Sequence, residues 1–141
     1  MLNLQAVSAQ DFDAMHELRM AAMRESLERL GRFDPERSRA RLAAGFEPPH
    51  MRHICRGEER IGFLTLVPEG EALNLKHLYL RPGQQGQGVG AWAMSWVKGH
   101  GRDVTLNALK QSDANRFYLR HGFVQTSEDE LDIQYRWSAP R

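Results

Sequence analysis

The chain has 141 residues, of which 41% are hydrophobic and 26% are charged, and its 19 basic and 18 acidic residues leave a formal net charge of +1. This length suits one domain with its own core, so we predict a single domain over residues 1–141. The balanced charge argues against nucleic acid or a membrane surface as a partner. Cys55 is the only cysteine, which excludes an intrachain disulfide and favours a reducing compartment. The chain has no stretch of ~20 apolar residues and no signal-peptide pattern, so we expect a cytoplasmic protein.

The first half of the chain predicts a strand, two helices and three strands. Residues 2–8 alternate apolar and polar side chains, which is typical of a short strand. Ser8 and Asp11 have the spacing of a capping box, and apolar residues then recur at helical spacing from Phe12 until Gly31. The remaining elements expected are a helix from Pro35 to about Ala44, a break at Pro48–Pro49, and strands at 51–57, 60–67 and 73–82.

The second half predicts two further helices and three strands. A helix is expected over 88–99, a strand over 104–109 and a helix over 112–122, which Gly122 would end. The segments FVQTS and LDIQYRW then form a hairpin across the acidic turn 127–130. Strands and helices in this order indicate an α/β fold with a mixed sheet.

Four glycines lie close together between the strand at 73–82 and the next helix: Gly83, Gly86, Gly88 and Gly90. Glycine is costly to order on folding, so such a cluster indicates a special backbone shape. A helix N-terminus carries unpaired N–H groups and a partial positive charge, and preceding glycines let phosphate oxygens approach those donors.

Three interpretations compete for this loop. A nucleotide-binding loop of the Walker type is excluded, because no Lys-Ser or Lys-Thr follows the last glycine. The string from Gly86 to Ala91 satisfies G-x-G-x-x-A, the dinucleotide fingerprint, but the next strand ends in Leu109 and Lys110 without the acidic residue that would hold a ribose. A tight turn that binds nothing is the remaining alternative.

Two segments together resemble the GNAT superfamily, the N-acyltransferases that use acetyl-coenzyme A. Gln85, Gly88 and Gly90 give Q-x-x-G-x-G directly after a strand, and a later helix carries A-x-x-x-Y-x-x-x-G-F. The second pattern consists of Ala114, Tyr118, Gly122 and Phe123. The predicted order of elements agrees with this family over nearly all of the chain. The resemblance implies a GNAT-like acyl-CoA N-acyltransferase fold, with a central, mixed and splayed sheet flanked by helices.

The resemblance also implies a cofactor site. In this family the main chain of the glycine loop cradles the pyrophosphate of coenzyme A, and the strand before it contributes backbone contacts to the pantetheine arm. The residues so implicated are Leu78, Tyr79, Leu80, Gln85, Gly86, Gln87, Gly88, Val89 and Gly90, with Asn115 on the later helix as a further contact. The family often has Asn three residues before its Ala, where this chain has Gln111.

Tyr118 and His77 are the catalytic candidates. Tyr118 matches the family tyrosine that protonates the departing thiolate, and a phenol with a pKa near 10 suits that role. One branch of the family uses a Glu as general base at the position of Asn74, which cannot titrate. His77 is the nearest group with a suitable pKa, and a water chain to solvent is the alternative. Asn107 is a further candidate for orienting the acceptor or a water.

These features together predict an acetyl-CoA-dependent N-acetyltransferase that acts on a primary amine of a small molecule or a peptide. A non-catalytic acyl-CoA-binding module, O-acetyl transfer and a longer acyl donor are the alternatives, and a homodimer is possible. The resemblance also implies that the acidic turn Glu128–Glu130 and residues 31–34 border the acceptor site, where the acidic turn would attract a cationic amine. His50 and His53 lack further ligands at metal-binding spacing, so we expect no metal there.

Overall fold

The computed structural model describes residues 1–141, and the chain divides into two compact units. Unit 1 comprises Met1–Thr65 and His77–Val89, and unit 2 comprises Leu66–Lys76 and Gly90–Arg141. The strands β3 (Glu59–Glu69) and β4 (Ala72–Leu80) each contribute residues to both units. The sequence-based assignment of one domain concerns independent folding and stays a prediction.

Seven strands form one mixed sheet in the order β1-β2-β3-β4-β5-β7-β6. β4 and β5 pair in parallel, at Leu73–Val104 and Asn74–Thr105, whereas β1–β2, β2–β3, β5–β7 and β6–β7 pair in antiparallel orientation. The other bounds are Leu2–Ala6 for β1, Met51–Arg56 for β2, Val104–Leu109 for β5, Val124–Glu128 for β6 and Asp132–Trp137 for β7. The predicted α/β class with a mixed sheet is confirmed.

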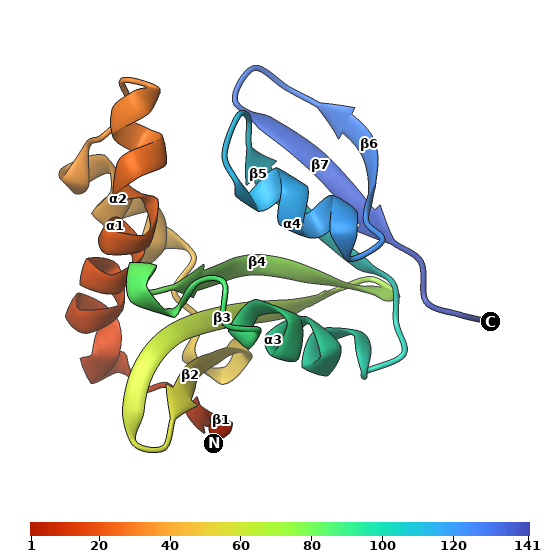
Figure 1. Cartoon of the computed structure of the whole chain (residues 1–141), viewed down its shortest axis with the longest axis horizontal. Coiled ribbons are helices and arrows are strands. Elements are labelled where there is room, and N and C mark those ends of the chain that lie inside the picture. Colours follow the sequence, from red (N-terminus) through yellow and green to blue (C-terminus); the bar gives the residue numbers. More distant parts are fainter. The chain divides into compact units, whose positions relative to one another are not determined.

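The two helices of unit 1 begin where the sequence places their caps. The predicted capping box opens a 3-10 turn, Ala9–Asp11, in which the amide of Ser8 donates to the Asp11 carboxylate at 2.9 Å, and this turn leads directly into α1 (Phe12–Arg29). Before α2 (Pro35–Ala44), the Asp34 carboxylate accepts from the amide of Arg37 at 3.1 Å, and Pro35 occupies the first turn. The two helices lie side by side in Figure 1, and the close match to the predicted bounds follows from these local signals.

The core of unit 1 joins α1 and α2 to the strands β2 and β3. Its buried members are Val7, Met15, Leu18, Leu42, Met51 and Phe63, and Phe12, Phe46 and Tyr79 pack against them. This cluster anchors β4 within unit 1, because Tyr79 belongs to that strand. The rest of the core of unit 1 includes the fully buried Ile54, Cys55, Ile61 and Leu64.

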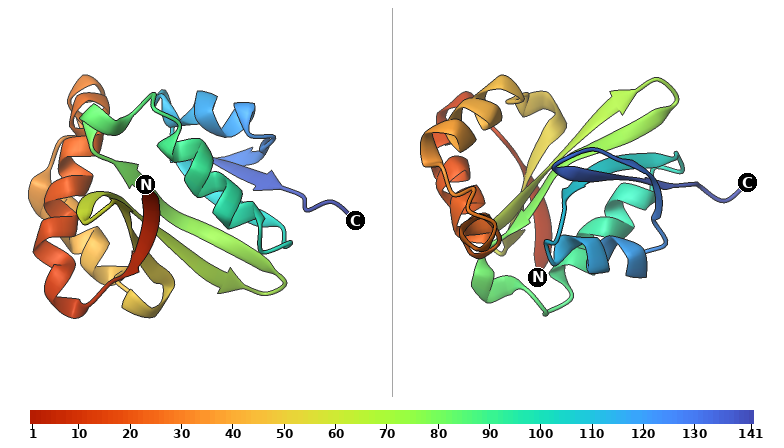
Figure 2. Two further views of the ribbon diagram at one scale, coloured as in Figure 1. Left: turned by 60° about the horizontal axis from the view of Figure 1, so that its bottom comes forward. Right: turned by 90° about the horizontal axis from the view of Figure 1, so that it is seen from above.

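Unit 2 contains α3 (Val89–Lys98) from Gly90 onwards, α4 (Ala114–Arg120) and the β6–β7 hairpin. Figure 1 and Figure 2 show α3 and α4 as neighbours. The buried side chains Ala93, Met94 and Val97 form the inner face of α3. At its C-terminal end, Lys98 donates to the carbonyl of His121 and lies 5.0 Å from the Trp137 ring centre, so it links α3 to α4 and β7.

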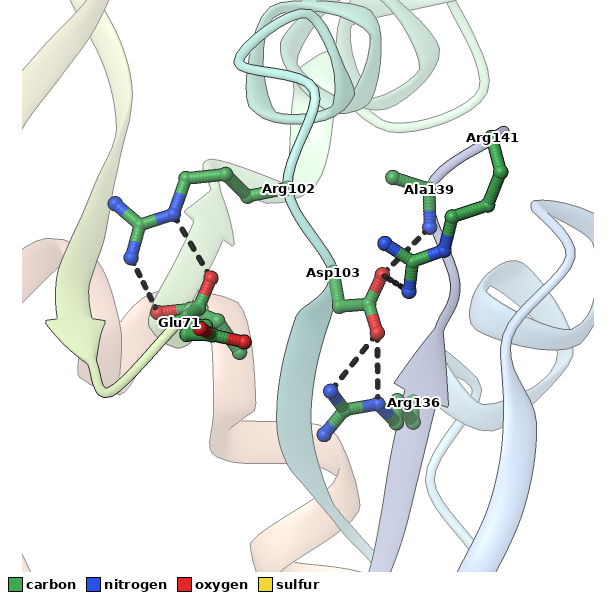
Figure 3. Close-up of polar contacts among 7 residues, drawn as sticks. Glu71, Arg102, Asp103, Arg136, Ala139 and Arg141 are labelled. Carbon is green, nitrogen blue, oxygen red and sulfur yellow. Dashed lines mark hydrogen bonds and ion pairs between the residues drawn. The ribbon is translucent and has the colours of Figure 1, made fainter.

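Two consecutive residues tie the strand ends of unit 2 together (Figure 3). Arg102 donates to the carbonyls of Gly70 and Glu71, in the turn between β3 and β4, both at 2.9 Å. The Asp103 carboxylate accepts from Arg136 on β7 at 2.8 Å and from the amide of Ala139 at 2.8 Å. These contacts hold the C-terminal segment against the start of β5.

Most predicted element bounds lie within about two residues of the observed ones, and two differences have physical causes. The strand predicted at 73–82 ends at Leu80, because Pro82 starts a 3-10 turn, Pro82–Gln84, that the sequence pattern did not indicate. The helix predicted at 112–122 covers only Ala114–Arg120, and Ser112 is instead used to bond the carbonyl of Leu109 at 2.8 Å.

Candidate functional site

The glycine loop of unit 1 runs from Arg81 to Val89 and connects β4 to α3. Gly86 and Gly88 have φ angles of 77° and 80°, a conformation that glycine adopts without strain. A Cβ atom placed on Gly83, Gly86 or Gly88 would meet no atom within 4 Å, so the space beside the main chain there is open. Glycine at 86 and 88 therefore serves the shape of the loop, and the open space would admit a ligand close to the backbone.

The amides of this loop differ in whether they are already occupied. Those of Gln84 and Gln85 donate to the carbonyls of Arg81 and Pro82, at 2.9 and 3.4 Å. The amides of Gly86, Gln87 and Gly88 have no acceptor within the protein. Because unpaired donors at the start of a helix attract anions, these three amides form the part of the loop best suited to a phosphate.

Gly90 has a different role from the glycines before it. A Cβ atom at this position would lie 2.9 Å from Cε1 of Phe117 on α4. Gly90 therefore makes room for the Phe117 ring and lets α3 approach α4, as well as carrying the last position of the Q-x-x-G-x-G pattern. The pattern alone did not distinguish Gly90 from Gly88, since the difference depends on a residue 27 positions away along the chain.

Arg56, at the end of β2, contacts the glycine loop through side chains. Its Nη2 donates to Oε1 of Gln84 at 3.2 Å and of Gln87 at 3.5 Å. Gln87 in turn donates through Nε2 to the carbonyl of Gly83 at 3.1 Å. The sequence pattern of β2 gives no sign of this role for Arg56, because it does not indicate which residues of the loop lie near the strand.

The C-terminal part of strand β4, which belongs to unit 1, carries His77, Leu78, Tyr79 and Leu80. Their approach to β3 requires Gly62, where a Cβ atom would lie only 2.3 Å from the carbonyl oxygen of Tyr79. The Tyr79 hydroxyl accepts from Nε of Arg19 on α1 at 3.2 Å. Arg19 also donates to Oγ of the buried Ser38 on α2. Tyr79 is thus fixed by side-chain contacts, while its predicted main-chain contact to a cofactor stays a prediction.

His77 is held by a hydrogen bond and two ring contacts. Its Nδ1 lies 2.8 Å from Oγ1 of Thr65 on β3. Its ring centre lies 5.9 Å from that of Phe63 and 5.8 Å from that of Tyr79. The role of His77 therefore depends on which of the two partners, Thr65 or His77, supplies the hydrogen.

The burial of Thr65 favours Thr65 as the donor. Its side chain has an exposed fraction of 0%, and His77 is its only polar partner. If His77 donated from Nδ1, the hydroxyl hydrogen of Thr65 would be buried without an acceptor, which is costly. If Thr65 donates to Nδ1, that hydrogen is satisfied. Neutral His77 then carries its own hydrogen on Nε2, which can donate a hydrogen bond but cannot accept a proton.

In unit 2, Tyr118 and Asn115 both lie on α4. Tyr118 is buried, with an exposed fraction of 7%, and its ring packs against those of Phe117, Phe123 and Tyr135. The Asn115 amide is used within the unit: Nδ2 donates to the carbonyl of Leu109 at 2.9 Å, and Oδ1 accepts from the Tyr135 hydroxyl at 2.7 Å. Asn115 therefore positions α4 against β5 and β7, and its cofactor contact stays a prediction.

Asn74 and Asn107, the two asparagines that the sequence raised in connection with catalysis, differ in their surroundings. Asn74 donates through Nδ2 to Oγ1 of Thr105 at 3.0 Å and to its carbonyl at 3.3 Å, at the last parallel pair of β4 and β5. It thus reinforces the junction of the two strands in unit 2. Asn107 lies on β5 opposite Gln134, and its side chain is exposed.

Two of the three carboxylates in the acidic turn Glu128–Glu130, which leads from β6 to β7, already have partners within unit 2. The Asp129 carboxylate accepts from the amides of Leu131 and Asp132, at 2.9 and 2.8 Å, and these bonds lower its pKa. Glu128 pairs with Lys110 at 2.6 Å, which lowers the pKa of Glu128. The proposed attraction for a cationic amine would therefore depend mainly on Glu130.

His53 belongs to an ion cluster in unit 1. Its Nε2 lies 2.9 Å from the Asp11 carboxylate, which also accepts from Arg60 at 3.1 Å. The contacts with His53, the Ser8 amide and Arg60 lower the pKa of Asp11 well below its ordinary value. No group of three or more His, Cys, Asp or Glu side chains suited to a metal ion occurs in the structure. None of the helices combines the length and the apolar character that crossing a bilayer requires.

Comparison with known proteins identifies the family. The model of the acetyltransferase (GNAT) domain matches residues 50–125, from β2 to the start of β6, which is more than half of the chain. No curated protein matches the chain in sequence.

Solved structures share the fold at low sequence identity. The PaiA N-acetyltransferase of Thermoplasma acidophilum, solved with coenzyme A, has a TM-score of 0.76 and 16% identity, with 98% of this chain and 99% of that chain covered. An acetyltransferase of Thermus thermophilus has a TM-score of 0.76 and 21% identity, with 98% and 97% covered. The ribosomal-protein-S18-alanine N-acetyltransferase of Escherichia coli has a TM-score of 0.70 and 13% identity, with 100% and 96% covered. The match of the family model to the larger part of the chain shows that this protein belongs to the GNAT acetyltransferase family.

Proposed function

We propose that the protein is an acetyl-CoA-dependent N-acetyltransferase that acts on a primary amine of a small molecule or a peptide. The observation that carries this proposal is the set of unoccupied amides at Gly86, Gln87 and Gly88, next to open space and at the start of α3, in a chain of the GNAT family. Neighbours in fold that are named N-acetyltransferases, one of them for a ribosomal-protein alanine, support an amine as acceptor.

The chain's own residues suit the phosphates of the donor. The open space beside Gly83, Gly86 and Gly88 fits the close approach of phosphate oxygens to the main chain. The partial positive charge at the N-terminus of α3 adds to the attraction. When bound, the donor supplies a thioester whose acetyl carbonyl the acceptor amine attacks. Leu78, Tyr79 and Leu80 would line the pantetheine arm through their main chains.

Two side chains carry the proton chemistry in this proposal. Tyr118 donates its phenolic proton to the departing thiolate sulfur. His77 contacts the reacting groups as a hydrogen-bond donor through Nε2–H, because the Thr65 hydroxyl occupies Nδ1. The acceptor amine therefore loses its proton to water, the route that the sequence offered as an alternative to a histidine base, and the Tyr118 phenolate regains a proton from water to complete the cycle.

The test is a turnover assay on the purified protein. Acetyl-CoA is incubated with panels of small primary amines and peptides with free amino groups, and the release of the free thiol is followed together with the acetylated product. The proposal predicts amine-dependent thiol release with one acetylated amine formed per thiol. Acetyl-CoA binding without turnover across both panels would favour the non-catalytic acyl-CoA-binding module. Ester formation on hydroxyl acceptors would favour O-acetyl transfer.

A further inference from the structure

We propose that Arg56 is a phosphate ligand of the acyl donor, held beside the glycine loop by Gln84 and Gln87. The inference rests on the proposed function and adds a specificity-determining side chain from β2 to a site otherwise made of main-chain donors. It follows from the contacts, the charge and the hydrogen-bond chemistry of this arginine.

The contacts of Arg56 place its guanidinium at the open part of the loop. The two glutamines that it reaches flank Gly86, whose amide is unoccupied and whose surroundings are open. The two bonds, at 3.2 and 3.5 Å, are longer than the usual N–H···O distance near 2.9 Å. The guanidinium is therefore oriented by the loop but weakly bound to it.

The charge of Arg56 is not neutralised by any carboxylate. Its only side-chain partners are the two neutral amide oxygens, although Glu59 lies opposite it in the β2–β3 register. Other arginines of unit 1 are ion-paired, such as Arg39 with Asp13 and Arg60 with Asp11. A full positive charge thus remains beside the amides that are free to bind an anion.

A phosphate oxygen is a stronger acceptor for this guanidinium than either glutamine. Charge-assisted hydrogen bonds are shorter and about twice as strong as neutral ones, and the planar fork of arginine matches phosphate oxygens in pairs. Binding of a phosphate would therefore draw Arg56 away from Gln84 and Gln87. The glutamine contacts hold the side chain near the site beforehand and reduce the conformational entropy lost on binding.

The experiment compares Arg56→Gln and Arg56→Lys with wild type, using Arg52→Gln as the matched control. Arg52 lies on the same strand and also binds only neutral oxygens, the carbonyls of Pro49 and Met51. Dissociation constants are measured by calorimetry for coenzyme A, dephospho-coenzyme A and inorganic pyrophosphate. Turnover with acetyl-pantetheine, which has no nucleotide phosphates, is measured in parallel, and thermal unfolding verifies the fold of each variant.

We expect Arg56→Gln to weaken coenzyme A binding by roughly tenfold, the effect of one lost charge-assisted bond, and to reduce its salt dependence. Acetyl-pantetheine turnover should not change, Arg56→Lys should recover part of the affinity, and Arg52→Gln should bind as wild type. An equal loss for dephospho-coenzyme A and pyrophosphate would assign Arg56 to the pyrophosphate, and a loss confined to coenzyme A would assign it to the ribose phosphate.

Two results would overturn the inference. One is unchanged affinity of Arg56→Gln for all three phosphate ligands, and the other is an equal loss with acetyl-pantetheine, which would indicate that Arg56 only shapes the loop. A different result would contradict the proposed function: wild-type protein that binds no coenzyme A or acetylates no amine. The pyrophosphate titration then still decides whether Arg56 binds phosphate.

Discussion

At the scale of single residues, the contact between Thr65 and His77 decides what the histidine can do. Burial of the Thr65 hydroxyl favours donation to Nδ1, which leaves the hydrogen of the neutral ring on Nε2. A histidine in this tautomer stabilises charge or orients a group, whereas a general base needs a free lone pair. The same residue in the same position would have the opposite role if Thr65 were replaced by a hydrogen-bond acceptor.

Replacement of His77 distinguishes the two roles. His77→Gln retains an N–H donor near the position of Nε2, so we expect it to keep kcat within about tenfold of wild type, whereas His77→Leu should lose one to two orders of magnitude. Steady-state turnover with a saturating amine measures the difference. Equal loss in both variants, together with loss of the acid limb of the pH–rate profile, would instead identify His77 as the general base.

Tyr118 has a separate test, because it is both a packing residue and the proposed acid. Tyr118→Phe keeps the buried ring with its contacts to Phe123 and Tyr135 but removes the hydroxyl. We expect kcat to fall by a factor of about 10² to 10⁴, as for loss of a general acid, with little change in the dissociation constant of acetyl-CoA. Unchanged turnover in this variant would rule out the general-acid role.

At the scale of elements, two glycines allow close approach of neighbouring elements. Gly62 admits the carbonyl of Tyr79 beside β3, and Gly90 admits the Phe117 ring beside the start of α3. Local propensity explains neither, since one glycine lies within a strand and the other at the start of a helix, where glycine is otherwise unfavourable. Both fix elements that carry predicted site residues, β4 and α4.

Alanine at Gly62 tests the first contact. Its methyl group would lie 2.3 Å from a backbone oxygen, which cannot move without shifting the strand. We expect Gly62→Ala to lower the free energy of unfolding by about 3 kcal/mol, at the upper end of the range for overpacking. Urea denaturation measures this value, and a loss below about 1 kcal/mol would contradict the close approach of β3 and β4.

Alanine at Gly90 should cost less and should be rescued. The added methyl group meets the far end of the Phe117 ring at 2.9 Å, which a smaller side chain would relieve. We expect Gly90→Ala to lower the free energy of unfolding by about 1 kcal/mol, after the better helix propensity of alanine has offset part of the clash. In urea denaturation, the double variant Gly90→Ala with Phe117→Leu should lose less unfolding free energy than the sum of the losses of the two single variants. Simple additivity would show that Gly90 and Phe117 do not interact.

At the scale of the whole molecule, ionisable groups in both units make the fold sensitive to acid. The pKa values of Asp11, Asp103, Glu128 and Asp129 are lowered by hydrogen bonds and neighbouring charges. Those of His16 and His121 are lowered first by burial and then by neighbouring cations. In every case the unfolded chain binds protons more readily than the folded one, so acid favours unfolding.

Stability should therefore decline in two stages as the pH falls. The histidine contributions are fully present above the ordinary pKa of about 6.5 and are lost below it, and the carboxylate contributions are lost as the pH falls below about 4. Chemical denaturation at a series of pH values measures both stages. His121→Gln should weaken only the first stage and Asp11→Asn only the second, whereas a stability that rises on acidification from pH 7 to pH 5 would contradict this account.

Sequence predicted those parts of the fold that depend on local signals. The start of α2 follows from Asp34 and Pro35, and the loop before α3 follows from its glycines and from Gln85. The contacts that give single residues their roles were not accessible, because they join distant segments: Thr65 with His77, Arg56 with Gln84, and Gly90 with Phe117. Nothing in the residue pattern indicated that the side-chain amide of Asn115 is hydrogen-bonded to Leu109 and Tyr135.

The most direct test of the central claim is calorimetric titration of the purified protein with acetyl-CoA, with NAD as the control ligand and Gly88→Trp as the control variant. We expect wild type to bind acetyl-CoA and not to bind NAD. The tryptophan side chain would fill the open space beside the free amides and would also strain the main chain at the φ of 80° that Gly88 adopts, so Gly88→Trp should lose acetyl-CoA binding. Absence of acetyl-CoA binding by wild type, or undiminished binding by Gly88→Trp, would contradict the assignment of the loop as the phosphate site of an N-acetyltransferase.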